Sequence, residues 1–316
     1  MSKLGEPLNI GGVAVKNNVW MAPLAGYTDF AFRKQCYKFG AGLCFTEMVS
    51  AKGLHFRSEA TAALLHTGEG EKQTAAQLFG SDPAILREAC ESEYLKDFPV
   101  VDLNMGCPMP KVVKNGEGSA LLEDFPKAAA VISACKRSGK AVTVKFRIGV
   151  RRGEPLAAEF AKLCEDAGAD ALPVPGRPRE AIYAGEPDFA QIAAAKRAVS
   201  IPVIANGGIF SRQGAEAMLD KTGADGVMIA RAAMTDPHIF AEILGGEEEW
   251  DRRAVIEEQI ADMLPFYGER YTVVQMRKMT AFYLHGMRGA AKHKARLFTC
   301  NSIAALREAL DDIFPA

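Results

Sequence analysis

The chemistry open to this chain is best approached from Cys107. This cysteine lies in the stretch GCPMPKVVKNGEG, residues 106–118, directly after the apolar run VVDLNM at 100–105. The Gly, Pro and Lys content predicts an accessible loop with positive charge nearby. No His–Asp or His–Asn pair is placed to activate a nucleophile, so Cys107 is either an inert loop thiol or a proton donor, for which a thiol of ordinary pKa suffices. Four other cysteines lie within apolar runs and are assigned to packing: Cys44, Cys90, Cys135 and Cys164.

Lys145 lies near the end of another apolar run, AVTVKFR at 141–147. It could form a Schiff base with a carbonyl substrate, as in sugar-phosphate aldolases. It could instead stay protonated and stabilise an anion, such as the N1–C2=O edge of a reduced flavin. A salt bridge to Glu47 or a neighbouring acid is the structural alternative. Gln77 and Asn104 can each donate and accept hydrogen bonds, which suits either the edge of a planar heterocycle or a buried polar network.

The elements that must position these residues recur regularly. Eight short apolar runs, bounded by Gly or Pro, predict strands buried on both faces, at residues 18–23, 42–48, 74–80, 100–106, 141–147, 169–176, 201–208 and 224–231. Helix-like stretches lie between them, at 81–97, 124–139, 155–168, 189–199 and 211–223. This alternation predicts an α/β fold, a (β/α)₈ TIM barrel; a doubly wound parallel sheet is the alternative.

Polar and small residues follow nearly every predicted strand. Buried strands that end in polar groups are costly unless those groups face a ligand, so the ends point to one convergent site. The strand ends at 206–208 and 230–231 lie within the stretches IANGGI and IARAAM. They are expected to present backbone N–H groups at helix starts, with Arg231 adding charge. Loops after strands 7 and 8 of a barrel commonly bind phosphate, so we expect a phosphorylated ligand there.

The alternation ends at GGEEEWDRR, residues 245–253, beyond which the pattern is helical. We therefore predict a barrel domain at 1–245 and a small all-helical domain at 246–316. Between residues 270 and 300 the helical part carries no Asp or Glu and seven cations: Arg270, Arg277, Lys278, Arg288, Lys292, Lys294 and Arg296. A solvated helix face explains them; interleaved aromatic residues make a nucleic-acid surface the competing interpretation.

Composition narrows the class of protein. The net charge of −1 argues against a wholly basic nucleic-acid binder but leaves room for a local basic patch. Seven scattered cysteines without a C-x-x-C pair fit reduced thiols, so we expect a cytoplasmic protein, and we expect it to be a monomer. The chain has no apolar run of bilayer length and no His spacing typical of a metal site, so neither membrane nor metal is expected.

The motifs together resemble a known family. MAPLAGYTDFAFR, GAGLCFTEMVSAKGL, QLFGSDP, DLNMGCPMPKVVKNGEGSALL, VTVKFRIG, IPVIANGGI and GADGVMIAR are similar, in order and spacing, to the flavin-dependent tRNA-dihydrouridine synthases, with the bacterial B-type branch nearest. RKMTAFYLHGMRGAAKHKARL resembles that family's C-terminal tRNA-binding helices. The resemblance implies an FMN-binding barrel that uses NADPH to reduce the C5–C6 bond of uridines in tRNA.

The resemblance also implies roles for particular residues. Cys107 would protonate C5 of uracil after hydride transfer to C6, and Asn104, Arg147 and Tyr183 would hold the flipped base. Lys145 would hold the N1/O2 edge of the flavin. The other implied flavin contacts are Pro23, Leu24, Ala25 and Gln77 around the ring, and Asn206, Gly207, Gly208, Ala230 and Arg231 at the phosphate. The residues expected to contact RNA, either tRNA or another structured RNA, are Arg277, Lys278, Arg288, Lys292, Lys294 and Arg296.

One departure separates this chain from the family pattern. Where the family usually reads VHGRTR, this chain reads VPGRPR, with Pro175 in place of a histidine beside the flavin and Pro178 in place of Thr. Pro173 also lies within a predicted central strand, which normally excludes proline. Smaller changes are Gly208 for an Asp, and Ala230 and Ala232 for glycines. Two alternatives therefore remain: a non-catalytic or altered-specificity RNA-binding relative, or a flavin-dependent reductase of a free pyrimidine similar to the dihydroorotate dehydrogenases.

Overall fold

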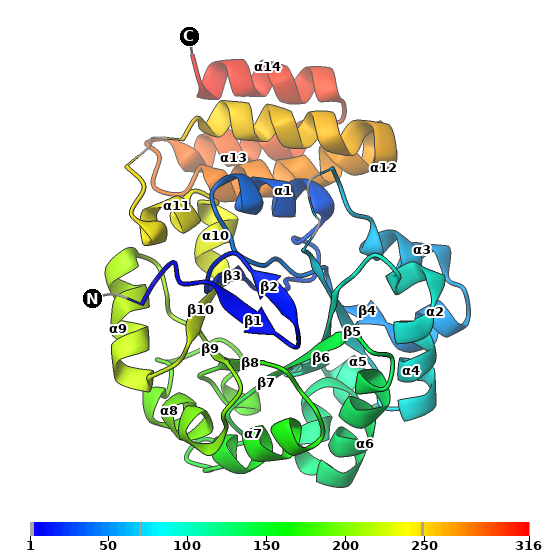
Figure 1. Cartoon of the computed structure of the whole chain (residues 1–316). Coiled ribbons are helices and arrows are strands. Elements are labelled where there is room, and N and C mark those ends of the chain that lie inside the picture. The colour runs from blue at the N-terminus through cyan, green and yellow to red at the C-terminus, as the bar shows by residue number, and fades with distance from the viewer. Residues whose placement is uncertain (1–2, 70, 72, 248–249, 316) are drawn as a thin grey trace.

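Two four-stranded parallel sheets form the barrel of the molecule (Figure 1). The computed structural model describes residues 3–69, 71, 73–247 and 250–315, so Glu248 and Glu249 of the predicted interdomain stretch lie outside it. One sheet has the order β3-β10-β9-β8 and the other β4-β5-β6-β7. The strands are β3 (Val19–Met21), β4 (Val49–Ser50), β5 (Ala75–Phe79), β6 (Val100–Met105), β7 (Ala141–Phe146), β8 (Leu172–Pro175), β9 (Val203–Asn206) and β10 (Gly226–Ile229).

Hydrogen bonds across two seams close these sheets into the predicted (β/α)₈ barrel. At the first seam, Met21 N donates to Leu43 O at 2.8 Å, and Ala75 N to Cys44 O at 2.9 Å, so residues 43–46 bridge β3 and β5. At the second, β7 meets β8 through a bridge between Thr143 and Ala171. The TIM-barrel prediction is confirmed.

The second predicted strand differs in detail from what the sequence indicated. Residues 42–48 make only isolated bonds to their neighbours, and the regular strand β4 begins at Val49. The reason is Thr46, whose Oγ1 accepts the hydrogen bond of Gln77 N at 3.0 Å and donates to Glu47 O at 2.8 Å. A side chain thus takes the acceptor place that a carbonyl fills in a regular ladder.

Pro173 lies in the central strand β8, and the structure shows how the barrel accommodates it. Leu172 N and Gly176 N both donate toward β9, to Pro202 O and Asn206 O at 2.8 and 2.9 Å. Because donors alternate between the two sides of a strand, the nitrogens of Pro173 and Pro175 face β7. A proline nitrogen cannot donate there, which explains why the β7–β8 contact is reduced to one bridge.

Helices cover the outside of the barrel at the places that the sequence indicated. The five predicted ones are α4 (Pro83–Glu91), α6 (Phe125–Lys136), α7 (Ala157–Asp166), α8 (Phe189–Ala198) and α9 (Arg212–Thr222). Asp82 and Asp124 cap α4 and α6 by accepting backbone N–H bonds. The other barrel helices are α1 (Phe30–Lys38), α2 (Ala51–His55), α3 (Glu59–Ala62), α5 (Pro110–Val113), α10 (Arg231–Thr235) and α11 (Ile239–Leu244).

The barrel interior is apolar at the amino ends of the strands. The inward-facing residues there form one buried cluster that includes Trp20, Phe45, Val100, Ile204 and Met228. An N-terminal hairpin, β1 (Leu8–Ile10) and β2 (Val13–Val15), covers this end and adds Ile10 and Val15 to the cluster (Figure 1). Among the described residues the amino end of the barrel is thus covered, and the opposite end is the one left for a ligand to enter.

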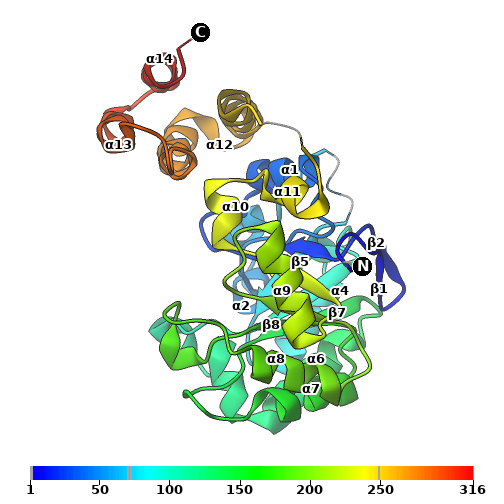
Figure 2. The same cartoon turned by 90° about the vertical axis from the view of Figure 1, so that its left-hand side faces the viewer.

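Three helices form a separate layer beside α1, α10 and α11 (Figures 1 and 2). They are α12 (Arg252–Tyr283), α13 (Ala290–Thr299) and α14 (Ile303–Ile313). Helix α12 is broken at Gly268 (φ 74°, ψ 168°), just after Pro265, and packs on α1 and α10. No helix within the described part of the chain is long and apolar enough to cross a bilayer.

Candidate active site

A cavity of about 580 Å³ opens at the carboxyl ends of the barrel strands. Every residue predicted to act on, or to hold, a small ligand lines it: Pro23, Leu24, Ala25, Gln77, Asn104, Cys107, Lys145, Arg147, Tyr183, Asn206, Gly207, Gly208, Ala230 and Arg231. These residues come from seven strand ends and their loops, separated by as many as about 200 positions in the chain. The structure thus brings the predicted site residues together.

The cavity floor follows from the two-residue period of the strands. Above the apolar layer, four strands turn polar residues inward: Gln77, Asp102, Thr143 and Asn206, of which Gln77 and Asn206 line the cavity. The layer above that carries Asn104 and Lys145, which are paired in register, and Pro175. Asp102 and Thr143 were missed as site residues, although the alternation in VVDLNM and AVTVKF was a usable signal.

Three residues hold the backbone around Cys107. The Oδ1 atom of Asn104 accepts from Cys107 N at 2.9 Å and from Gly106 N at 3.2 Å. The buried Ser119 donates to Cys107 O from its Oγ at 2.8 Å and from its backbone N at 3.1 Å. Arg147 Nε donates to Gly106 O at 2.8 Å. Cys107 is half-buried, whereas the other cysteines are buried, so its thiol alone among them is open to the cavity.

A buried network lies below Cys107. Asp102 accepts from Thr143 Oγ1 at 2.5 Å and from Gln77 Nε2 at 2.6 Å. The Oε1 atom of Gln77 accepts in turn from Asn104 Nδ2 at 2.9 Å. Both polar groups of the Gln77 amide are therefore engaged by the protein, which leaves only its second N–H for the flavin contact that the sequence led us to expect.

Burial shifts the pKa values of the two ionisable groups in these layers in opposite directions. Burial raises the pKa of Asp102 to about 7, against the hydrogen bonds from Gln77 and Thr143 and the nearby Lys145, which lower it. Burial lowers the pKa of Lys145 to about 8, against the attraction of Asp102, which raises it. The alternative of a salt bridge from Lys145 to Glu47 is not seen among the described residues, and Glu47 accepts a hydrogen bond from Gly26 N.

Arg147 is largely committed to the protein backbone. Its Nη1 donates to Pro178 O at 3.0 Å and to Ile182 O at 2.8 Å, in addition to the Nε bond to Gly106 O. It thus ties the loop after β8 to the loop that carries Cys107. Ile182, at the cavity rim, has a left-handed backbone (φ 49°), which is strained for a β-branched residue, and the adjacent Tyr183 is 64% exposed.

Glycines and guanidinium groups build the part of the cavity wall that follows β8, β9 and β10. Gly207 and Gly208 both have positive φ (121° and 71°), and a Cβ on Gly207 would lie 2.9 Å from Arg177 Nη1. Partial burial lowers the pKa of Arg177, and the neighbouring Arg231 lowers it further. Arg177 directly follows the predicted strand at 169–176 and was not among the residues expected to hold a phosphate. Two close cations beside a backbone without side chains fit a phosphate group.

Helices were expected to begin directly at the ends of β9 and β10, and this holds for β10 only. Helix α10 begins at Arg231, directly after β10, but α9 begins only at Arg212, several residues beyond the Gly-Gly pair. The consecutive positive φ angles turn the chain away from helical geometry at Gly207 and Gly208, so any anion there would meet a loop and not a helix terminus.

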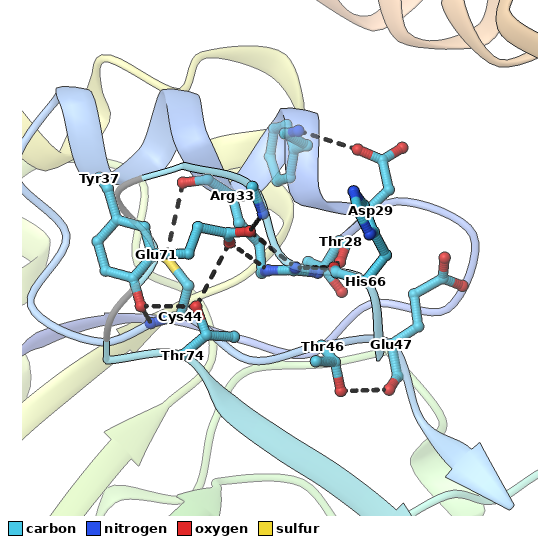
Figure 3. Close-up of polar contacts among 12 residues, drawn as sticks. Thr28, Asp29, Arg33, Tyr37, Cys44, Thr46, Glu47, His66, Glu71 and Thr74 are labelled. Carbon is cyan, nitrogen blue, oxygen red and sulfur yellow. Dashed lines mark hydrogen bonds and ion pairs between the residues drawn. The ribbon is translucent and has the colours of Figure 1, made fainter. Parts of the chain in front are cut away.

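The loop after β3, which carries Pro23, Leu24 and Ala25, leads to Thr28, and a buried ion pair between Arg33 and Glu71 holds the Thr28 carbonyl (Figure 3). Arg33 Nε contacts Glu71 Oε1 at 2.7 Å, and Arg33 Nη1 donates to Thr28 O at 2.5 Å. Arg33 and Glu71 are both almost fully buried, so losing either would leave an unpaired charge in the core. The pair therefore orients the guanidinium that holds the end of this loop at Thr28 O.

The helical layer reaches the same loop from the other side. Gln275 Nε2 donates to Gly26 O at 2.8 Å and to Asp29 Oδ2 at 3.2 Å, and Lys278 Nζ also donates to Gly26 O. The Lys278 ammonium lies 4.2 Å from the ring centroid of Tyr27, which lines the cavity. Partial burial lowers the pKa of Lys278, although Glu47 and Asp29 raise it.

The six residues expected to contact RNA divide into two groups. Arg277 donates to Phe298 O and Cys300 O, Lys278 to Gly26 O, and Arg296 pairs with Asp312. The others, Arg288, Lys292 and Lys294, are exposed or half-buried, and among the described residues they make no ion pair. The described residues also hold no cluster of His, Cys, Asp and Glu suited to a metal ion.

Comparison with known proteins matches the chain to one family model and to several relatives. The family model described as dihydrouridine synthase (Dus) matches residues 20–315. The tRNA-dihydrouridine synthase B of Pseudomonas aeruginosa is 38% identical over 300 residues, which are 92% of this chain and 90% of the relative. That of Vibrio parahaemolyticus is 35% identical over 97% of this chain and 98% of its own.

Solved structures share the fold at low identity. A 2-naphthoyl-CoA reductase complex aligns with a TM-score of 0.62 and 12% identity, over 77% of this chain and 52% of its own. A morphinone reductase mutant in complex with tetrahydroNAD aligns with a TM-score of 0.58 and 15% identity, over 80% and 93%. At this identity the likeness concerns the barrel architecture alone.

Proposed function

The chain belongs to the dihydrouridine synthase family, and from this premise we propose that it reduces uridine to 5,6-dihydrouridine in tRNA, with FMN as cofactor and NADPH as electron donor. The observation that carries the proposal is the convergence of Cys107, Lys145 and the Arg177–Arg231 pair on one cavity. It supports an oxidoreductase that holds a phosphorylated planar cofactor beside a proton donor.

The residues around the cavity fit a flavin mononucleotide. Arg177 and Arg231, with the open backbone at Gly207 and Gly208, would hold the phosphate, together with Asn206 and Ala230. Lys145 would hold the N1/O2 edge of the ring, and its burial makes a bound anion the favoured partner for its charge. The loop Pro23–Ala25 and Gln77 would border the ring. When bound, the flavin supplies the hydride for C6 of uracil.

The chain itself would supply the proton. Cys107 Sγ would donate to C5 of the uracil as general acid, from a backbone fixed by Asn104, Ser119 and Arg147. The remaining N–H of Asn104 and the exposed Tyr183 ring would hold the base, and Arg147 would contribute mainly by joining the two loops that border it. A fixed backbone with a thiol facing the cavity suits repeated proton transfer to one atom.

We propose residues 1–245 as the catalytic domain and 246–316 as the domain that binds RNA. Arg288, Lys292 and Lys294 would neutralise phosphates, because their charges are open to solvent. Arg277, Lys278 and Arg296 are engaged within the protein and would act on RNA binding mainly through the positions of α12 and α13. The target uridine would leave its stack and enter the cavity.

The experiment that tests this function uses the purified protein and uridine-containing tRNA. We expect a yellow protein with an FMN spectrum that NADPH bleaches and tRNA restores, with dihydrouridine formed in the RNA. A colourless protein that binds tRNA would point to a non-catalytic relative, and reoxidation by a free pyrimidine alone would point to a small-molecule reductase. Mapping dihydrouridine in cells with and without the gene would identify the uridine.

A further inference from the structure

The hydrogen-bond chain below Cys107 has two ends whose roles are fixed. At the upper end, the backbone N–H of Cys107 can only donate, so Asn104 must turn its Oδ1 atom toward it. At the lower end, an ionised Asp102 can only accept, so Gln77 must turn its Nε2 atom toward it. The two amides between them then meet in one way, Asn104 Nδ2 to Gln77 Oε1, at 2.9 Å.

An amide side chain does not by itself prefer either orientation, because its oxygen and its N–H₂ group are alike in shape and differ only in that one accepts and the other donates. If Asp102 were replaced by an amide, Gln77 could turn over and offer its N–H₂ to Asn104. Asn104 would then turn its oxygen down to accept it, and its N–H₂ would face the N–H groups of Gly106 and Cys107. The N–H groups of Gly106 and Cys107 oppose this second arrangement from above, and the buried carboxylate opposes it from below. Asp102 and Gln77 are almost fully buried, so water does not take the place of either partner.

We propose that Asp102 is a positioning residue, which fixes the Cys107 backbone through the directions of the Gln77 and Asn104 amides. It touches neither Cys107 nor the open part of the cavity. The role deepens the function proposed above and rests on it for its effect on catalysis. The positive charge of Lys145, on the adjacent strand β7, lowers the pKa of Asp102 and so favours the ionised form of the carboxylate.

The first test reads the Cys107 backbone without RNA or turnover. Iodoacetamide is applied to the flavin-loaded protein, and alkylation at Cys107 is followed by mass spectrometry well above pH 7, where a carboxyl of pKa about 7 is mostly ionised. The other cysteines are buried, so the folded protein reacts at Cys107 first. For Asp102→Asn we expect a rate about tenfold higher, since loss of one holding hydrogen bond multiplies the open population by about that factor. A rate equal to that of the parent would overturn the proposal.

Two further variants distinguish an effect on the directions of the Gln77 and Asn104 amides from a general loss of stability around Asp102. Thr143→Val removes the other hydrogen bond of Asp102 but keeps the carboxylate facing Gln77; we expect a lower melting temperature with alkylation like the parent's. Gln77→Met removes the middle member of the hydrogen-bond chain. If the two residues act through one chain, the double variant Asp102→Asn with Gln77→Met should be alkylated no faster than the faster of the two single variants. Two results would contradict the proposal. One is fast alkylation of Thr143→Val; the other is a rate increase in the double variant equal to the product of the increases in Asp102→Asn and Gln77→Met.

The second test measures the reaction. The flavin is reduced chemically, tRNA is added, and dihydrouridine is measured in a single turnover, so that reduction by NADPH plays no part. We expect Asp102→Asn to form product about tenfold more slowly or worse, with unchanged tRNA affinity. An unchanged product rate would overturn the proposal. If the parent forms no dihydrouridine the proposed function fails, yet the alkylation test still decides whether Asp102 positions Cys107.

Discussion

Lys278, on α12, donates a hydrogen bond to the carbonyl of Gly26, in the loop that carries Pro23, Leu24 and Ala25 along the cavity. Lys278, which was expected to contact RNA, thus holds the loop that lines one side of the cavity. The same Gly26 donates its N–H to Glu47 and accepts from Gln275, so this loop is held jointly by the barrel and by the helical layer.

Lys278→Met should therefore weaken flavin retention and leave the salt dependence of tRNA binding nearly unchanged. The matched control is Lys292→Met, which lies on exposed α13 and makes no ion pair among the described residues. It should lower the slope of log affinity against log salt by about 0.7–0.9 for each phosphate that the lysine neutralises, and leave flavin retention alone. Both are measured by flavin release on dilution and by tRNA titration in salt. An equal drop in slope for both variants would make Lys278 a phosphate contact.

Cys107→Ala should uncouple the two halves of the reaction. Flavin reduction by NADPH should stay within a few-fold of the parent, because the thiol is proposed to act only in the protonation of C5 of uracil, after the flavin has been reduced. Dihydrouridine formation should fall by about 100-fold or more, the usual contribution of a placed general acid. Stopped-flow absorbance follows the first half and nucleoside analysis of the tRNA the second. Product formation at the parent's rate would remove Cys107 from the mechanism.

Pro175→His tests the departure from the family pattern. Pro175 lines the cavity, and its ring offers no hydrogen-bond donor. An imidazole there could donate to the flavin and restore a backbone N–H toward β7, so we expect flavin to dissociate about tenfold more slowly, the effect of one hydrogen bond to a charged group. Pro178→Thr, in the same loop, serves as the control and should change flavin release little. Unchanged or faster flavin loss from Pro175→His would show that the site is adapted to proline.

Glu165 provides a pH test of the fold away from the cavity. Its carboxylate accepts from Ser200 Oγ at 2.6 Å and from Ser200 N at 2.8 Å, which lowers its pKa from 4.5 to about 2. Because the folded pKa lies below the unfolded one, its stabilisation is complete above about pH 4.5 and is lost as the pH falls toward 2.

Glu165→Gln should accordingly lower the free energy of unfolding near neutral pH by about 1 kcal/mol, a modest value because the group borders solvent. The difference from the parent should narrow on acidification. Urea unfolding at neutral pH and at about pH 3 measures it. A difference that stays constant over this range would mean that the carboxylate charge does not contribute.

Much of the site could be predicted from the sequence because a barrel has a simple geometry. Gly and Pro mark the strand ends, and all parallel strands end on one face, so Asn104, Lys145 and Asn206 had to converge once the strands were counted. The two-residue period places Asp102 below Asn104 in the same way. The caps at Asp82 and Asp124 are local in sequence, and they too were predictable.

Contacts between segments far apart in the chain were not predictable. The sequence does not show that Arg147 grips the backbone at Gly106, Pro178 and Ile182, because a guanidinium fits a substrate equally well. Nor does it indicate that Lys278 would turn to Gly26, some 250 positions away, since charge along a helix does not say which partner comes near it.

The amino-acid sequence by itself determined the strand count, the cavity residues and the candidate proton donor, because local spacing and parallel topology suffice for these. Only the tertiary structure decided how each polar group is used. Burial removes water as a partner, so every donor and acceptor must find one in the protein, and the match that results depends on all the strands at once. The sequence places Asp102 below Asn104, but only the tertiary structure shows that Gln77 and Thr143 are its hydrogen-bond partners.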